Sequence, residues 1–478
     1  MIVNFFKKYY AEIVLCLLLI GVAAVSLPNL TTKPRLWYDE GVNIEFAKNF
    51  LDFGKLDIQV SPGIFSQLTV LPQASGYPLS IFLSLFFGIF GFGPVQARIY
   101  MLIWMLLALL SVFIFVKKLV GRDLALIVAA LIATFASFHD NGRVVMGEIP
   151  GFVFLLWALY WFFWKNSYLI SGLLFGLAIS AKPSVYMSVF PAILVLLILN
   201  RKNFWKNSLK ILAGILPAFF LRIWFAMPDM LSLVAWKEVI NLFRNPFGND
   251  ISLTASFLNN LLSIPKTYTI LYFGLFFAII LFEYFRYKKK DFIYNQFFGF
   301  TITYCFFAFL YYLKSPGWLR YLIAAEFLTF ILLVPALKNI FKGRHGKDIF
   351  YAVAVSLIGF QIFYLFNYAK IFYSDSEERV INLIDTEFRD KTIGIFDIPE
   401  IGVFVDSSRK FQIYRMMGVP SIGKNPILYE PAPEIFIIRA NNNEGIDKML
   451  PEEKNIFFKK YYFLRTVGRY NIYSEIIF

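Results

Sequence analysis

The sequence predicts an all-α polytopic membrane protein followed by a small extracytoplasmic α/β domain. About eleven transmembrane helices and one juxtamembrane helix are expected. Hydrophobic residues fill 58% of the 478 positions, whereas soluble domains contain about 45–50%. Mean hydropathy is +0.62. The long apolar runs end near residue 369, and the remaining chain is more polar.

The first apolar run, Ala11 to Pro28, is long enough to cross a bilayer, which takes roughly 17–25 residues. A cleaved signal peptide is the alternative, because residues 24–26 resemble a cleavage site. The length of the run and the spans that follow favour a retained helix. Further spans are expected at 98–116, 124–139, 149–164, 167–181, 185–200, 209–226, 267–285, 292–313, 321–338 and 349–369.

These spans place residues 1–369 in a transmembrane domain with outer loops at 29–97 and 227–266. Within the first loop, Pro78 to Gly91 is apolar but too short to cross the membrane. We therefore expect a juxtamembrane helix there. Counting it as a span would scatter the basic turns over both sides of the membrane.

Basic residues in the turns between spans fix the orientation. The positive-inside rule makes the side that carries them cytoplasmic. The N-terminus is therefore expected in the cytoplasm, and the net charge of +14 reflects topology rather than a nucleic-acid-binding stripe. These residues are Lys7 and Lys8, then Lys117, Lys118, Arg122, Lys165, Arg201, Lys202, Lys206, Lys210, Arg286, Lys288, Lys289, Lys290, Lys338, Lys342, Arg344 and Lys347.

Cysteine and histidine are scarce. Cys16 and Cys305 both lie in apolar runs, which argues against a structural disulfide. Two histidines, His139 and His345, are too few for a His-rich metal site.

The segment 370–478 is predicted to be a small extracytoplasmic α/β domain. Residues 374–378 open a charged, helix-like stretch. Three stretches have the β-branched and aromatic enrichment of strands: Thr392–Asp397, Glu434–Arg439 and Tyr461–Tyr473. No motif in this domain indicates chemistry, and we expect it to contact the acceptor or close the cavity.

Ionisable residues that do not belong to basic turns collect on the outer side of this topology. Moving such a group into hydrocarbon costs roughly 2.5–3.5 kcal/mol, so a cavity or a lipid phosphate beside it would be favourable. The set comprises Asp39 and Glu40 after the first span, then Arg143, Glu148, Lys182, Lys314 and Arg320.

Acids and cations in one place suit glycosyl transfer from a lipid phosphate. A carboxylate can take the proton from an acceptor hydroxyl as that hydroxyl attacks the anomeric carbon. Fixed cations can stabilise the leaving phosphate as its charge develops. A single displacement of this kind inverts the sugar and needs no protein nucleophile.

Each of these residues also has a structural interpretation. Asp39, Glu40 and Glu148 could cap the helices that follow them, because acids are favoured at helix starts. Lys182 before a proline could be a turn residue, and Arg320 could reach the headgroups from a helix end.

Several motifs resemble those of the GT-C membrane glycosyltransferases, in the branch of dolichyl-phosphate-mannose protein mannosyltransferases and bacterial aminoarabinose transferases. The resemblance covers roughly residues 30–330. Its acidic motif is Leu36-Trp37-Tyr38-Asp39-Glu40-Gly41, followed by Ala47-Lys48-Asn49. The juxtamembrane helix and second span match at Gly76-Tyr77-Pro78-Leu79 and Arg98. The second acidic motif is Arg143 with Glu148 and Pro150, and the basic motifs are Lys182-Pro183 and Arg320-Tyr321-Leu322.

The resemblance implies a polyprenyl-phosphate sugar donor, an active site at the outer membrane face, and Asp39 as the catalytic base. Glu40 and Glu148 would be accessory catalytic acids. Arg143, Lys182 and Arg320 would bind the donor phosphate. Tyr38, Tyr77, Arg98 and Tyr321 would line the cavity. The family more often has Asp at the position of Glu148, and often His-Pro-Pro where this chain has Gly76-Tyr77-Pro78, departures that concern the acceptor more than the reaction.

The expected partners are the lipid-linked donor, membrane lipids and a lipid, glycan or protein acceptor, with no nucleic acid. No cofactor or metal is expected to be required, although the carboxylates could hold a divalent cation. A transporter or flippase of lipid-linked glycans is the alternative function. Transporters usually show repeated halves and polar groups at mid-membrane, and neither pattern is found in this sequence.

Overall fold

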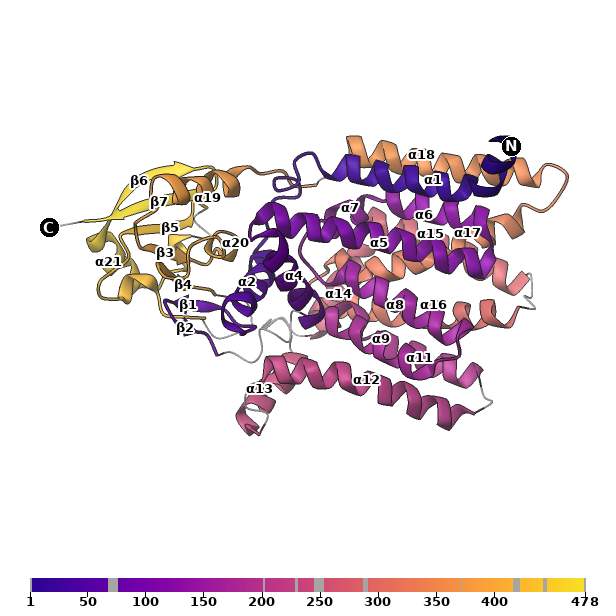
Figure 1. Ribbon diagram of the computed structural model, residues 1–478, viewed down its shortest axis with the longest axis horizontal. Helices are drawn as coiled ribbons and strands as arrows, with labels where there is room; N and C mark the ends of the chain where they lie inside the picture. Colours follow the sequence, from indigo (N-terminus) through magenta and orange to yellow (C-terminus); the bar gives the residue numbers. More distant parts are fainter. Residues whose placement is uncertain are drawn as a thin grey trace.

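A computed structural model describes residues 2–67, 76–200, 203–227, 231–244, 253–286, 291–369, 371–415, 422–441 and 445–476. The molecule is elongated, with a bundle of long helices at one end and a sheet domain at the other (Figure 1). Helices from the first long loop lie between these two parts. The fold class predicted from the sequence is confirmed.

A helix is present at every predicted span. The helices are α1 (Ile2–Ser26), α5 (Pro94–Val120), α6 (Arg122–Thr134), α7 (Ala136–Gly142), α8 (Glu148–Trp164), α9 (Tyr168–Ala181), α10 (Pro183–Tyr186), α11 (Val189–Leu199), α12 (Phe204–Ala226), α15 (Tyr268–Arg286), α16 (Phe292–Lys314), η2 (Leu319–Leu322), α17 (Ile323–Ile340) and α18 (Gly346–Asn367). In the described part of the chain, seven are long and apolar enough to cross a membrane, or eight if α6 and α7, bent by 63°, form one span. The helices α8, α9 and α11 are shorter, so the count of eleven spans stays a prediction.

The first long loop folds into α2 (Tyr38–Phe53), a two-stranded hairpin of β1 (Gln59–Ser61) and β2 (Ile64–Phe65), and α4 (Tyr77–Phe90). Helix α4 confirms the helix expected over Pro78–Gly91. It begins with a proline in its first turn, where the missing N–H leaves no hydrogen bond unmade. The hairpin was not predicted, because strands of three and two residues are too short to show alternation.

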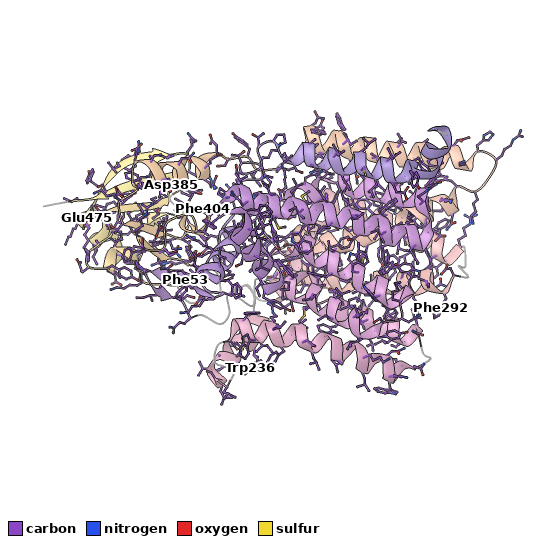
Figure 2. The ribbon with its side chains drawn as sticks, in the orientation of Figure 1. Phe53, Trp236, Phe292, Asp385, Phe404 and Glu475 are labelled. Atoms are coloured by element: carbon purple, nitrogen blue, oxygen red, sulfur yellow. The ribbon has the colours of Figure 1, made fainter. Side chains whose placement is uncertain are left out.

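The second long loop contains α13 (Leu233–Arg244), α14 (Leu253–Ser263) and the short helix η1 (Ile264–Lys266). Helix α13 follows α12 and lies at the edge of the bundle, where Figure 2 labels its residue Trp236. Ala235 and Val239 are buried with Met227, at the end of α12.

The C-terminal domain is a five-stranded sheet in the order β4-β3-β5-β7-β6. Strand β3 is parallel to β4 and β5, whereas β7 is antiparallel to β5 and β6. Its elements are α19 (Ser376–Thr386), β3 (Ile393–Phe396), α20 (Pro399–Gly402), β4 (Lys410–Ile413), η3 (Pro426–Leu428), β5 (Ile435–Arg439), η4 (Ile446–Lys448), α21 (Pro451–Lys460), β6 (Tyr461–Val467) and β7 (Tyr470–Glu475).

Two details of this domain differ from the sequence prediction. The single strand expected over Tyr461–Tyr473 is a hairpin, because Gly468 adopts a φ of 58° and turns the chain. Strand β4 was not predicted, since Lys410 and Gln412 interrupt its apolar pattern. Both polar side chains are fully buried, and their partner lies far away in the sequence.

The sheet domain and α2 share one hydrophobic core. Val42 and Phe46 of α2 are buried in the same cluster as Ile395 and Ile401 of the sheet domain. Phe404 packs against Phe92 of the first loop, with ring centroids 5.6 Å apart, and Figure 2 shows it at the junction between the two parts. Helix α2 is therefore held from both sides.

Replacing Gly41 with alanine is expected to destabilise this junction by about 1–3 kcal/mol, because the new methyl group would collide with the backbone of Pro399 and Glu400. Thermal unfolding of the purified protein would measure the effect. Gly21→Ala is the matched control, since Gly21 is also helical but has open space around it. Equal unfolding temperatures for the two variants would contradict the close contact.

Candidate active site

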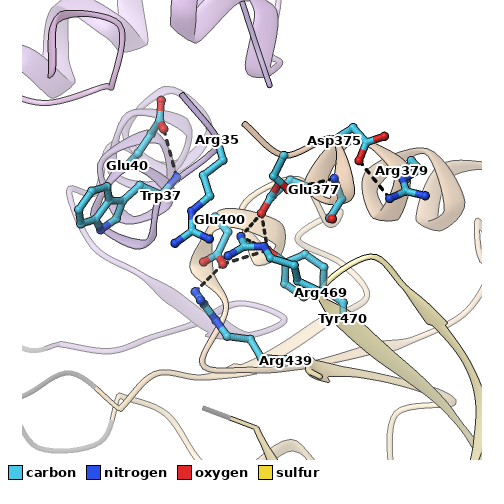
Figure 3. Close-up of polar contacts among 12 residues, drawn as sticks. Arg35, Trp37, Glu40, Asp375, Glu377, Arg379, Glu400, Arg439, Arg469 and Tyr470 are labelled. Atoms are coloured by element: carbon cyan, nitrogen blue, oxygen red, sulfur yellow. Dashed lines mark hydrogen bonds and ion pairs between the residues drawn. The ribbon is translucent and has the colours of Figure 1, made fainter. Parts of the chain in front are cut away.

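The adjacent acids at the start of α2 point in different directions. Successive residues of a helix are turned by about 100°, so Asp39 and Glu40 face different neighbours. The Asp39 side chain is 32% exposed, whereas that of Glu40 is completely buried. The backbone N–H of Trp37 donates to Glu40 at 3.3 Å (Figure 3). Glu40 therefore caps its own helix, as one interpretation of the sequence held.

Glu40 forms a buried ion pair with Arg98, which stands in the first turns of α5. The Nε atom of Arg98 is 2.7 Å from Oε1 of Glu40, and Nη2 donates to Oε2 at 2.7 Å. Glu40 also accepts from the backbone N–H of Val145 at 3.2 Å, and Arg98 donates to the carbonyl of Arg35 at 3.3 Å. Burial raises the pKa of Glu40, and Arg98 opposes the rise. These contacts favour a positioning role for Glu40 and Arg98.

Asp39 faces the short helix η2. Its Oδ2 atom accepts from Nη2 of Arg320 at 3.0 Å. The Arg320 guanidinium lies over the rings of Trp318 at 4.7 Å and Trp37 at 5.3 Å, and over Tyr321 at 5.7 Å. Flat aromatic faces attract a guanidinium and fix its plane. Arg320 is thus held in one orientation beside the most exposed of the predicted catalytic acids.

Glu148 and Lys182 face each other at the ends of two helices. The Lys182 Nζ atom is 4.0 Å from Oε1 of Glu148. The helix α9 ends at Ala181 because Lys182 precedes a proline, which disfavours a helical backbone at that position. The start of α8 comes so close to this break that any side chain at Gly147 would collide with the carbonyl of Ala181. Tyr186 also donates to the backbone carbonyl of Glu148.

The Asp39–Arg320 pair and the Glu148–Lys182 pair lie near each other. Arg320 Nη1 contacts the sulfur of Met146 at 3.5 Å, two residues before Glu148, and the charge of Glu148 acts on Arg320. Both carboxylate oxygens of Glu148, and Nε of Arg320, are buried without a hydrogen-bond partner. Buried polar atoms are normally satisfied. These atoms are placed to receive a polar ligand.

Arg143 is directed elsewhere. Its Nε atom donates to the backbone carbonyl of His139 at 3.0 Å, and the charges acting on it are Arg98 and Asp140. The geometry therefore offers less support for Arg143 as a phosphate ligand than for Lys182 and Arg320.

Two of the tyrosines predicted to line the cavity contact other parts of the chain. The Tyr38 hydroxyl donates to Asp397 of the sheet domain at 3.0 Å. Tyr77 is buried against Phe225, with ring centroids 5.7 Å apart, and its hydroxyl has no hydrogen-bond partner. Tyr321 stays beside Arg320. Only Tyr321 of these three lies at the paired acids and cations.

Sequence reasoning missed two buried polar residues near the site. Arg222 of α12 donates to the carbonyl of Ser180 at 2.6 Å and acts electrostatically on Tyr77. Glu45 of α2 accepts from Lys410 at 2.7 Å, Gln412 at 2.8 Å and Tyr414 at 3.0 Å. Glu45 lies six residues after Asp39 in α2, about 1.7 turns on and on a different face of the helix, and nothing in the sequence marked it as buried.

The described residues contain no group of three His, Cys, Asp or Glu side chains placed to hold a metal ion. Asp39 and Glu148 each face a cation instead. The site brings together two acids, Asp39 and Glu148, and two cations, Arg320 and Lys182.

Residues 78–225 match the family model of dolichyl-phosphate-mannose-protein mannosyltransferases. The matched stretch contains Arg98, Arg143, Glu148 and Lys182, whereas Asp39 and Arg320 lie outside it. No curated protein matches the chain.

Solved membrane glycosyltransferases share the fold. ArnT from Cupriavidus metallidurans bound to undecaprenyl phosphate gives a TM-score of 0.60 at 11% identity, over 96% of this chain and 98% of ArnT. The Archaeoglobus fulgidus oligosaccharyltransferase complex with Zn and sulfate gives 0.59 at 14% identity, over 96% and 73%. Arabinofuranosyltransferase AftD from Mycobacteria gives 0.54 at 12%, over 96% and 40%. The resemblance to the GT-C fold predicted from the motifs is confirmed.

Removing one partner of the Glu40–Arg98 pair is expected to destabilise the protein by about 3–5 kcal/mol, because the other charge is left buried and unpaired. Thermal unfolding of Arg98→Leu would show this as a large fall in Tm. The double variant Arg98→Leu with Glu40→Leu should recover much of the loss. A double variant as unstable as the sum of the two single variants would argue against direct coupling.

Proposed function

We propose that the protein is a membrane glycosyltransferase that moves a hexosyl or pentosyl group from a polyprenyl-phosphate donor to an acceptor hydroxyl. The observation that supports this most directly is the pairing of Asp39 with Arg320 beside Glu148 and Lys182, with buried polar atoms lacking partners between them. The match to mannosyltransferases and the fold shared with ArnT, which was solved with undecaprenyl phosphate, support the same donor class.

In the proposed step, the acceptor oxygen attacks the anomeric carbon from the side opposite the phosphate. The bond between that carbon and the phosphate oxygen breaks, and its electron pair stays on the polyprenyl phosphate. Asp39 takes the proton from the acceptor hydroxyl as a general base. The sugar is transferred with inversion, and Arg320 and Lys182 stabilise the negative charge of the leaving phosphate.

Arg320 has a second role in this proposal. Its contact with Asp39 occupies the carboxylate in the structure. A donor phosphate offers the parallel N–H donors of the guanidinium another pair of oxygen acceptors, so its arrival would draw Arg320 away from Asp39. The Asp39 carboxylate is then free to accept a proton only when the donor is bound. The acceptor hydroxyl is therefore not deprotonated before a donor is present.

Glu148 is proposed to position the reactants. Its two oxygens lack hydrogen-bond donors, so hydroxyl groups of the sugar or acceptor can satisfy them. Hydroxyls placed there would be held close to Lys182 and the phosphate. The finer placement of Arg143, Tyr38 and Tyr77 around the substrate stays a prediction.

We also propose that the chain is a multi-pass protein with a cytoplasmic N-terminus and an extracytoplasmic active site and sheet domain. The basic turns of the sequence support this orientation. No bound metal is proposed to be required, and transfer that stops in excess EDTA would overturn this part of the proposal.

Asp39→Asn is expected to lower kcat by about 10²–10⁴-fold, because the amide cannot accept the acceptor proton. Transfer of a labelled sugar by full-length protein in proteoliposomes would measure the loss. Asp52→Asn is the matched control, since Asp52 is exposed at the other end of α2. Full activity of Asp39→Asn would refute the base assignment, and movement of the donor across the bilayer without transfer would favour a flippase.

Lys182→Gln is expected to raise the donor KM and lower kcat, together reducing kcat/KM by at least about tenfold, because a charge-assisted contact to phosphate is lost. Donor titrations in the same assay would separate the two constants. Lys314→Gln removes a cation from the end of α16 and serves as the control. Equal donor constants for Lys182→Gln and the control would remove Lys182 from the phosphate site.

A further inference from the structure

The chain segments that leave α1 and α18 meet beside the sheet domain. The backbone N–H of Arg35 donates to the carbonyl of Phe372 at 2.8 Å, and that of Ser374 donates to the carbonyl of Thr32 at 2.9 Å. Both segments therefore emerge from the bundle at one place, where the chain passes from the membrane helices to the sheet domain (Figure 1).

Exposed aromatic side chains mark this place as the level of the membrane surface. Phe366, Tyr368, Phe372 and Tyr373 are each 60–66% exposed at the end of α18 and just after it. Tyrosine and tryptophan are enriched where the hydrocarbon meets the headgroups. The guanidinium of Arg35 lies over the Phe372 ring, 5.4 Å from its centroid. Arg35 is thus at headgroup depth.

Arg35 points into a cluster of charged residues from the sheet domain (Figure 3). Arg439 is paired with Glu400 at 2.6 Å, and Arg469 is paired with Glu377. Both carboxylates are almost fully buried. The Tyr470 hydroxyl donates to either carboxylate, 2.9 Å from Glu377 and 3.1 Å from Glu400.

Among the described residues, the cluster brings three guanidinium groups together with two carboxylates. Among the described residues, no carboxylate lies within ion-pair distance of Arg35. Burial and the nearby charges of Arg469 and Arg439 lower the pKa of Arg35, and the charge of Glu377 partly opposes them. An anion beside Arg35 would relieve this repulsion.

We propose that Arg35, with Arg439 and Arg469 behind it, binds the phosphate group of a membrane phospholipid. The depth of the site favours a lipid, because the same guanidinium lies beside exposed aromatic rings that suit acyl chains. Guanidinium groups bind phosphate through paired N–H donors. The bound lipid would join the first loop to the sheet domain and hold that domain at the membrane surface.

This site is separate from the paired acids and cations of the candidate active site. Within the described part of the chain, Arg35 reaches that region through its backbone carbonyl, which accepts from Arg98. The proposal therefore stands or falls independently of the transfer reaction, and it can be tested on protein without donor or acceptor.

The test is a titration of full-length protein in detergent with phosphatidylglycerol, followed by native mass spectrometry of the first bound lipid. Arg35→Gln is expected to weaken that binding by about tenfold, because one charge-assisted contact is lost. Arg379→Gln is the matched control and should bind as the unaltered protein does, since Arg379 is exposed on α19 and paired with Asp375. A phosphate-free galactolipid should bind equally weakly to all three proteins.

Equal phosphatidylglycerol affinity in Arg35→Gln and the unaltered protein would overturn the proposal. Tight galactolipid binding would overturn it as well, because the acyl chains alone would then account for retention. Inorganic phosphate that binds as tightly as the lipid would assign the site to a soluble anion instead. If Arg35→Gln aggregates, Arg35→Lys replaces it, and a several-fold loss of affinity is still expected because the planar pair of donors is gone.

Discussion

The buried ion pair between Glu40 and Arg98 determines how the candidate site is assembled. Through this one contact, the start of α2, the start of α5 and the backbone at Val145 are tied together. A charge removed from water is tolerated only with such partners. Asp39 is adjacent in the chain, so its direction follows from the anchoring of Glu40. Asp39 can stay partly exposed because its neighbour Glu40 is fixed.

Much of the fold could be predicted because membrane helices carry their signal locally. The length of an apolar run indicates by itself whether a helix there can cross the membrane. For this reason each predicted span coincides with a helix, and α4 was recognised as too short to cross. Placing the outer ionisable residues on one side predicted that Asp39, Glu148, Lys182 and Arg320 share a face, but not which acid pairs with which cation. Charge asymmetry between turns carried that information.

The remaining features depend on contacts between distant parts of the chain. Glu45 is a buried acid, and strand β4 contains the buried Lys410. Each is explained only by the ion pair between them, which joins residues 365 positions apart. Glu40 and Asp39 are both acids at a helix start, and only the fold separates the buried anchor from the exposed candidate base. For Arg143, the motif implied a phosphate ligand, and the sequence did not predict that its side chain would donate to the carbonyl of His139.

The hydrophobic core shared by α2 and the sheet domain restricts how this protein can vary. If the chain ended after α18, Val42 and Phe46 would lose their buried partners in the sheet domain, and the helix that presents Asp39 would lose that part of its packing. A sheet domain taken from a relative would have to reproduce that apolar surface. It would also have to reproduce the close approach of the Pro399 and Glu400 backbone to Gly41. A change in one of the two parts therefore has to be matched in the other, because they share this core.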